Sequence, residues 1–176
     1  MRMISKNHLG LLAAAILLGG TSLLPAADGK DAKETKTCSL EAGGHAILHF
    51  TTPGDASCKN ADGSLIVKRN KIEEVEVWVI KNAKTLDEAV KLAPEQIVSE
   101  FKNFKAKETK ELTVAGGPAK RLTGDGAEAD DGDPGHADIV VFKVGSHLFV
   151  ACTHGETLKP GAQEMMLSML KSAKAP

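Results

Sequence analysis

Aromatic residues are scarce in this chain of 176 residues. It has no Tyr, five Phe and a single Trp, Trp78, so aromatic side chains make up 3% of the sequence. Proteins that bind single-stranded nucleic acids or sugars stack the ligand on exposed aromatic rings. The shortage of such rings argues against both classes of ligand.

The chain also lacks an excess of positive charge. Its formal net charge is −1, from 22 Lys and Arg against 23 Asp and Glu. Two of the basic residues, Arg2 and Lys6, lie in the first 27 residues, which hold no acidic residue, so the remainder carries −3. Proteins that bind nucleic acids concentrate Lys and Arg against the phosphates. We therefore expect no nucleic acid among the partners.

Long apolar runs are missing as well. The run from Leu9 to Leu18 has ten residues, whereas a membrane-spanning helix needs about 20. Two basic residues precede this run and small residues follow it, which is the order of a secretory signal peptide. We predict a signal peptide over residues 1–27, cleaved near Ala26–Ala27, a periplasmic or secreted product, and no permanent membrane span.

Three cysteines, Cys38, Cys58 and Cys152, remain after this segment. In an exported protein two cysteines usually form a disulfide. We favour Cys38–Cys58, because this bond would tie the N-terminal arm to the first hairpin, and closing a loop of about 21 residues stabilises a fold by roughly 3 kcal/mol. Cys152 lies in an apolar segment and is expected to be buried. The spacing alone leaves the other pairings open.

The rest of the chain divides into an arm and a domain. Residues 28–43 begin with a charged stretch without apolar period, which predicts a flexible arm. Residues 44–176 have the length of a single domain with its own core. Within it, residues 45–51, 65–69 and 72–80 are expected strands.

The strand over 72–80 alternates clearly. Val75, Val77 and Val79 fall on one face, while Glu74, Glu76, Trp78 and Ile80 fall on the other. The valine face belongs in a core. Trp78 and Ile80 indicate that another element covers the far end of the second face.

Two helices are expected. Thr85 and Glu88 form a capping-box pattern, and apolar residues at spacings of three and four continue from Leu86 to Phe104. Pro94 predicts a kink or a division into two short helices there. A second helix is expected over residues 160–173, with Pro160 in its first turn.

The later strands are apolar on both faces. The segments 139–144 and 147–153 are joined by Gly145 and Ser146, a pattern typical of a two-residue hairpin turn. Because neither face of these strands is polar, we expect helices on both sides of an antiparallel sheet. The predicted fold class is α+β, an αβα sandwich.

Several segments resemble the PsbP-like superfamily, which includes the PsbP proteins of photosystem II and exported bacterial DcrB proteins. They are HAILHFTTPGDA from His45, TLDEAVKLAPEQIVSEF from Thr85, VAGGPAKRLTG from Val114, and HLFVACTHG from His147 with the closing helix. The resemblance covers residues 44–173. It implies an αβα sandwich that acts as a binding or assembly accessory and not as an enzyme.

The acidic segment 125–138 is the candidate ligand site. It offers carboxylates on a glycine-rich backbone, and calcium prefers six to eight oxygen ligands in irregular loops. The spacing does not fit an EF-hand, and a solvated hairpin tip is the competing interpretation. The candidate calcium ligands are Asp125, Glu128, Asp130, Asp131 and Asp133.

Catalytic motifs are missing. The chain has no G-x-S-x-G elbow. Cys152 and His154 share a strand face, but no basic cluster near them in the sequence would activate the thiol. We therefore expect an exported, non-enzymatic binding or assembly accessory of the cell envelope with a protein partner and no cofactor. The alternative is a calcium-binding protein that uses the acidic segment.

Overall fold

The computed structural model of the chain describes residues 34–61 and 63–176. The predicted signal peptide and residues 28–33 of the predicted arm lie outside them. The elements are, in order, β1 (Thr35–Ala42), β2 (His45–Pro53), β3 (Ser57–Ala61), β4 (Ser64–Arg69), β5 (Glu73–Val79), α1 (Leu86–Gln96), β6 (Phe101–Val114), β7 (Gly117–Glu128), β8 (Pro134–Val144), β9 (His147–Gly155) and α2 (Pro160–Lys171).

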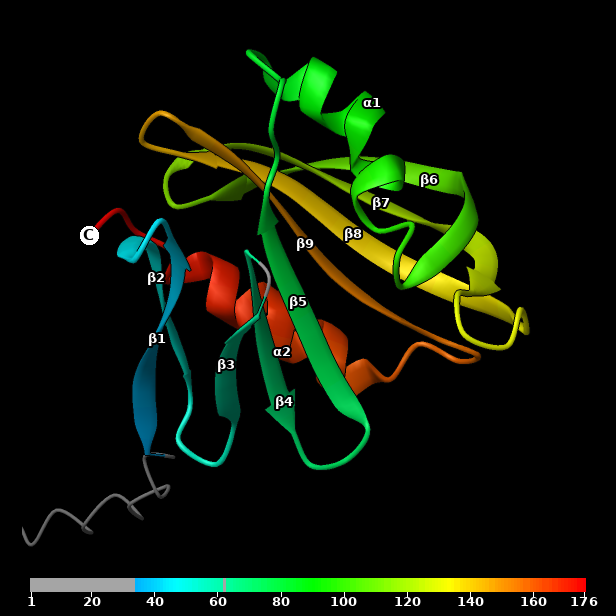
Figure 1. The fold of residues 1–176 in the computed structure, drawn as a ribbon, viewed down its shortest axis with the longest axis horizontal. Coiled ribbons are helices and arrows are strands. Elements are labelled where there is room, and N and C mark those ends of the chain that lie inside the picture. Colours follow the sequence, from blue (N-terminus) through cyan, green and yellow to red (C-terminus); the bar gives the residue numbers. More distant parts are fainter. Residues whose placement is uncertain (1–33, 62) are drawn as a thin grey trace, which may run out of the picture. The chain divides into compact units, whose positions relative to one another are not determined.

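The structure is mostly antiparallel sheet with two helices, an α+β arrangement. Seven strands form one sheet in the order β3-β4-β5-β9-β8-β7-β6, and β1 pairs with β2 in a separate hairpin (Figure 1). Each strand pair is antiparallel. Strand β9 comes last in the chain but pairs between β5 and β8. The closing hairpin therefore lies at the centre of the sheet.

Both faces of the central strands are buried, as their sequence predicts. In β9, Val150 and Cys152 pack in a cluster with Ala89 and Ala93 of α1. Ala151, between them, packs in a second cluster with Met166 of α2. That second cluster also contains residues of β1 and β2. Because successive strand residues point to opposite faces, the two clusters lie on different sides of the sheet.

Helix α1 begins as predicted and ends earlier. The Thr85 hydroxyl accepts from the Glu88 amide and the Glu88 side chain accepts from the Thr85 amide, so the capping box is confirmed. The helix ends at Gln96, two residues after Pro94, which stays within one helix. Phe101 and Phe104 lie in β6, so the expected continuation of the helix to Phe104 is wrong. Their apolar spacing matches a helix, but Phe101 is buried from a strand.

The prediction of a flexible arm over residues 28–43 is wrong for its second half, because Thr35–Ala42 forms the strand β1. In this strand Cys38 and Leu40 are buried, Ser39 between them is half-buried, and the other residues are exposed. Strand β1 pairs along its length with β2. Two buried side chains were too few to reveal the strand among its charged neighbours.

The disulfide between Cys38 and Cys58 is present, which confirms the predicted pairing. It joins β1 to β3, the edge strand of the large sheet, across 20 positions of sequence. Asn60 of β3 adds a second link, because its side chain donates to the Ser39 carbonyl oxygen (2.8 Å) and accepts from the Glu41 amide (3.0 Å). The small hairpin is thus fastened to the edge of the sheet. None of the helices in the described part of the chain is long and apolar enough to cross a membrane.

Candidate functional site

A hollow with a volume of about 530 Å³ lies beside Trp78. Its apolar wall is formed by Trp78, Val79, Ile47 and Ala42. The remaining lining residues are polar or small: Glu41, Gly43, Gly63, Lys81, Gln96 and His147. We call these ten residues the Trp78 groove.

The groove lies where several turns meet at one end of the sheet. The end of β1 contributes Glu41 and Ala42, and the turn after it contributes Gly43. The β3–β4 turn contributes Gly63, and His147 begins β9. Gly43 and Gly63 have φ of 60° and 84°, a conformation that costs glycine little because it has no Cβ. Both turns lie in the lining of the groove beside Trp78.

Trp78 is placed in the groove by the alternation of β5. It lies between Ser64 of β4 and Val150 of β9 in the ladder and packs beside the cluster that contains α1. Ile80 is buried in the same cluster, so the expectation that another element covers this end of the strand is confirmed. Trp78 itself stays partly exposed and faces both the core and the groove.

The rim of the groove carries exposed hydrogen-bonding groups of both charges. Glu41, Lys81 and His147 are exposed, and Gln96 is half-buried at the end of α1. Many protein-binding sites combine an apolar centre with a polar rim, and Trp is enriched among the residues that contribute most to their binding energy.

The predicted calcium ligands do not all lie in one loop. Asp125 and Glu128 belong to β7, and only the turn 129–133 separates β7 from β8. Asp125 contacts Lys107 of β6 and accepts from His136 Nδ1 of β8 at 2.8 Å. The hydrogen bonds from Lys107 and His136 hold the pKa of the Asp125 carboxyl below its usual range. This carboxylate already has two cationic or hydrogen-bonding partners.

The other three candidates occupy the exposed turn. Asp130 Oδ1 accepts from the Asp131 amide at 2.9 Å, and Asp131 Oδ1 accepts from the Asp133 amide at 3.0 Å. Two of the carboxylates therefore shape the turn itself. Among residues 34–61 and 63–176, no three His, Cys, Asp or Glu side chains are placed to hold one metal ion. The calcium site stays a prediction.

The glycines of the acidic segment have a structural role that the sequence did not suggest. Gly126 of β7 and Gly135 of β8 pair directly across the sheet. A Cβ at Gly126 would overlap the Phe101 ring, and one at Gly135 would lie 3.0 Å from it. The paired glycines thus form a flat surface on which the fully buried Phe101 lies.

Cys152 and His154 line a smaller pocket of about 130 Å³ on the same face as α1. The other lining residues are Lys71, Ile72, Glu74 and Glu76. Burial raises the pKa of the Cys152 thiol well above its usual range, and the nearby negative charge of Asp138 adds to this effect. His154 Nδ1 donates to Glu128 Oε2 at 2.9 Å. The raised pKa favours the protonated thiol, whereas an activated cysteine nucleophile needs a lowered pKa.

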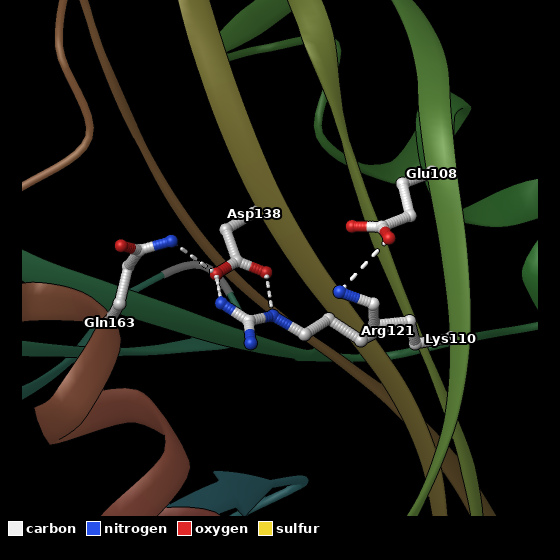
Figure 2. A network of polar contacts seen from close by, with 5 residues as sticks. All are labelled: Glu108, Lys110, Arg121, Asp138 and Gln163. Carbon is white, nitrogen blue, oxygen red and sulfur yellow. Dashed lines mark hydrogen bonds and ion pairs between the residues drawn. The ribbon is translucent and has the colours of Figure 1, made fainter. Parts of the chain in front are cut away.

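A buried ion pair lies on the α2 side of β7 and β8 (Figure 2). Asp138 is fully buried and accepts from Arg121 Nε at 2.8 Å, from Arg121 Nη2, and from Gln163 Nε2 of α2 at 2.8 Å. The Lys110–Glu108 pair lies near it on β6 (2.9 Å). Because both oxygens of Asp138 accept hydrogen bonds, from Arg121 and from Gln163, this carboxylate connects α2 to the sheet.

The sequence had singled out Trp78 but not the groove around it. The groove residues come from segments between positions 41 and 147, and the ladder order brings them together. No motif joins them in the sequence. The alternation of β5, with an aromatic residue on its otherwise acidic face, was the one available signal.

Comparison with known proteins shows the fold. No protein-family model matches the sequence, and no curated protein matches it. Among 16 matching solved chains is the solution structure of cyanobacterial PsbP (CyanoP) from Synechocystis sp. PCC 6803, with a TM-score of 0.53 and 12% identity over 87% of this chain and 99% of that chain.

A second similar structure is a crystal structure of a protein from Bacteroides thetaiotaomicron VPI-5482. Its TM-score is 0.54 and its identity 11%, over 80% of this chain and 48% of that one. The chain therefore spans about half the length of the Bacteroides protein. These similarities show a PsbP-like fold, and the resemblance inferred from the sequence is confirmed at that level.

Proposed function

We propose that this protein is an exported, non-enzymatic binding or assembly accessory that holds a protein partner in the Trp78 groove. The main observation in support of the proposal is that Trp78 is partly exposed and lines a hollow of about 530 Å³. The fold by itself does not select this function, because one fold serves many.

The partner that fits the groove is a protein surface with a protruding apolar side chain. Trp78, Val79 and Ile47 offer an apolar wall to that side chain. The charged groups Glu41 and Lys81 on the rim would pair with polar groups around it. Replacing an aromatic residue at such a binding hot spot with Ala commonly weakens the complex by more than about 2 kcal/mol.

The burial and the raised pKa of Cys152 support the proposal that the protein is not an enzyme. Its thiol is 1% exposed, and burial raises its pKa. A nucleophilic cysteine needs the opposite, a lowered pKa and access to substrate.

Export is supported by the disulfide, because such bonds persist in oxidising compartments. We also propose that the layers, with α1 on one face of the sheet and α2 with the β1–β2 hairpin on the other, form the αβα sandwich that the resemblance implies. The alternation of buried residues along β9 between the two clusters supports this arrangement.

Site-specific photo-crosslinking in the native envelope tests the partner. A photo-reactive residue replaces His147 on the rim of the groove, and a second variant carries it at Lys110 on β6, outside the groove. We expect a discrete crosslinked protein from position 147 and none of the same mass from position 110.

The identified protein is then titrated against the wild-type chain. Trp78 is the only Trp and there is no Tyr, so all of this chain's own Trp emission comes from the groove, and the emission of the partner alone is subtracted. Binding at the groove changes the emission, and Lys81→Glu weakens binding while Lys110→Glu does not. Equal crosslinking from both positions, or binding without any change in Trp emission, contradicts the proposal.

A further inference from the structure

Strand β6 forms one edge of the seven-stranded sheet (Figure 1). It pairs with β7 and is the last strand in the order, so no strand within residues 34–61 and 63–176 pairs with its other side. The unpaired side of an edge strand presents backbone N–H and C=O groups that bind other extended chains. Strand β6 is therefore a candidate interaction surface.

The turn that follows β6 determines which of its backbone groups bond to β7. Ala115 and Gly116 are the two central residues, and their φ angles of 50° and 77° are both positive, as in a type I′ turn. Val114 and Gly117 face each other across this turn. The residues that flank such a two-residue turn form a hydrogen-bonded pair. Val114 therefore directs its own N–H and C=O groups toward β7.

The outward backbone groups follow by alternation. Hydrogen-bonded and non-hydrogen-bonded pairs alternate along an antiparallel ladder, and the pairing of β6 with β7 is regular from Glu108 to Val114. Thr109, Glu111 and Thr113 therefore direct their N–H and C=O groups to the open edge. All three residues are exposed, and none of the backbone hydrogen bonds found outside the ladders of the described residues involves them.

The first half of β6 is protected against strand addition, whereas the second half is not. Lys102, Lys105 and Lys107 lie in the first half, where two register shifts interrupt the ladder with β7. Lysines and bulges on an edge strand are devices that prevent the pairing of another chain. The stretch from Glu108 to Val114 has no register shift, so it is the open part of the edge.

A hollow lies on each side of this open part. Residues 111–113 line both a hollow of about 390 Å³ and another of about 290 Å³. The first lies toward α1, because Leu86 of that helix lines it. The second lies toward α2, because Leu167 and Leu170 line it. Successive side chains of an added strand point to opposite faces, so they would enter the two hollows alternately.

The hollow toward α2 combines apolar side chains with positive charge. Leu112 and Leu167 are half-buried in its lining. Lys110 and Lys171 are exposed beside them, and Lys171 takes part in none of the ion pairs found among the described residues. Strand β6 itself carries four Lys against two Glu. A chain that is complementary to this face offers apolar and acidic side chains.

We propose that the edge of β6 from Thr109 to Thr113 binds an extended segment of a second protein, distinct from the partner in the Trp78 groove. The segment adds a strand to the sheet by backbone hydrogen bonds, and its side chains provide specificity. On the α2 face it has an acidic residue opposite Lys110 and apolar residues opposite Leu112 and Val114. Its sequence therefore has the pattern acidic-x-apolar-x-apolar, in either direction.

A second copy of this chain fits the edge less well. Symmetric antiparallel pairing centred on Glu111 would place two Glu side chains opposite each other, which is destabilising. Pairing centred on Thr109 would meet the register shift between Ala106 and Glu108. The proposal is also independent of the Trp78 groove, because none of the residues that line that groove belongs to β6.

Selection from a random peptide library displayed on phage tests the proposal with the wild-type protein. We expect the enriched peptides to share the acidic and apolar alternation. A synthetic copy of one enriched peptide should slow amide hydrogen exchange at Thr109, Glu111 and Thr113, as measured by NMR. Exchange at Lys110 and Leu112, whose amides already bond to β7, should not change. Failure to enrich any peptide overturns the proposal, and so does unchanged exchange at the three outward amides.

Backbone variants test whether the N–H groups of the edge bind the peptide. Thr113→Pro removes an outward N–H, which an edge strand tolerates, and should weaken peptide binding about tenfold or more. Thr113→Ala keeps the N–H and is the matched control, with wild-type affinity. Equal affinity of the two variants overturns the proposal. The exchange measurement on wild-type protein decides the question even if Thr113→Pro does not fold.

Charge variants separate this edge from the Trp78 groove. Lys171→Glu should weaken binding of the peptide about tenfold, whereas Lys143→Glu on β8, outside the hollow, should not. Affinity that falls with Lys81→Glu and not with Lys171→Glu places the peptide in the groove and overturns the proposal, while it leaves the proposed function intact. A dimer in sedimentation that Thr113→Pro dissociates would assign the edge to a second copy instead.

Discussion

At the scale of single residues, Glu76 shows how position on a strand changes the chemistry of a side chain. It lies on the acidic face of β5, where burial and the charges of Glu100 and Glu74 raise its pKa to about 7. The Ser64 hydroxyl donates a weak hydrogen bond to it at 3.4 Å, which opposes this shift only in part. The folded state therefore prefers the protonated form.

This preference predicts a pH-dependent stability in metal-free protein. A carboxyl whose pKa is higher in the folded than in the unfolded state, about 7 against 4.5, binds more protons when folded. Below about pH 4.5 this carboxyl group does not lower the free energy of unfolding. The free energy of unfolding falls as the pH rises toward 7. Thermal unfolding with EDTA should show Glu76→Gln matching wild type near pH 4.5 and exceeding its Tm by about 2–4 °C above pH 7.

Glu111→Gln, on the exposed part of β6, is the control for this measurement. It should follow the wild-type curve at each pH. A constant difference between Glu76→Gln and wild type from pH 4.5 to pH 8 would contradict the assignment of the effect to ionisation of Glu76.

At the scale of elements, the junction between α1 and β6 depends on one side chain. Phe101 begins β6 and is fully buried, and its ring lies over Gly126 and Gly135. Its backbone amide donates to the Ile97 carbonyl at 2.7 Å. The chain can therefore leave the helix and enter the edge strand within four residues.

The contact predicts a specific effect of adding one methyl group. Gly126→Ala places a Cβ against the Phe101 ring and within 2.5 Å of the Lys102 carbonyl oxygen. Overpacking of this kind costs about 1–3 kcal/mol, and urea unfolding measures it. Gly117→Ala is the control, because its Cβ would meet nothing closer than 3.6 Å. Equal stability of the two variants would mean that Phe101 does not depend on a flat glycine surface.

At the scale of the whole domain, the disulfide and several hydrogen bonds fasten the hairpin β1–β2. The disulfide ties β1 to β3, and the β2 residue His49 exchanges backbone hydrogen bonds with Lys174 after α2, at 2.9 and 3.1 Å. Leu40 and Leu48 of the hairpin are buried in the same cluster as Met166 of α2. The hairpin therefore completes the core on the α2 side.

Removal of the disulfide should loosen this hairpin first. Replacing both Cys38 and Cys58 with Ser lowers the free energy of unfolding by about 3 kcal/mol, because the closed loop of 20 positions no longer restricts the unfolded chain. Urea unfolding gives the value, and hydrogen exchange locates it in β1 and β2. Cys152→Ala, which leaves the disulfide intact, is the comparison. Unchanged exchange in β1 would contradict the proposed fastening role.

The features of the fold that could be predicted from the sequence alone depend on local interactions. The alternation of Val75, Val77 and Val79 identified a strand and its core face. The Thr85–Glu88 capping box fixed the start of α1, and strands apolar on both faces predicted that both sides of the sheet are buried. Each signal depends on spacings of two to four residues, so it can be read without knowledge of strand pairing. The disulfide was predicted from the expected exported compartment and from the tie that it would make between the N-terminal arm and the first hairpin.

Features that depend on contacts between residues far apart in the sequence were decided only by the tertiary structure. Phe101 fits a helical pattern, but pairing with β7 makes it a strand residue, and its ring lies over the glycine pair of β7 and β8. The acidic segment had the composition of a loop, but pairing with β6 and β8 extends β7 to Glu128. The Trp78 groove and the Cys152 pocket exist because β9 inserts between β5 and β8. Strand order is set by burial of both faces over the whole domain, and no local spacing carries that information.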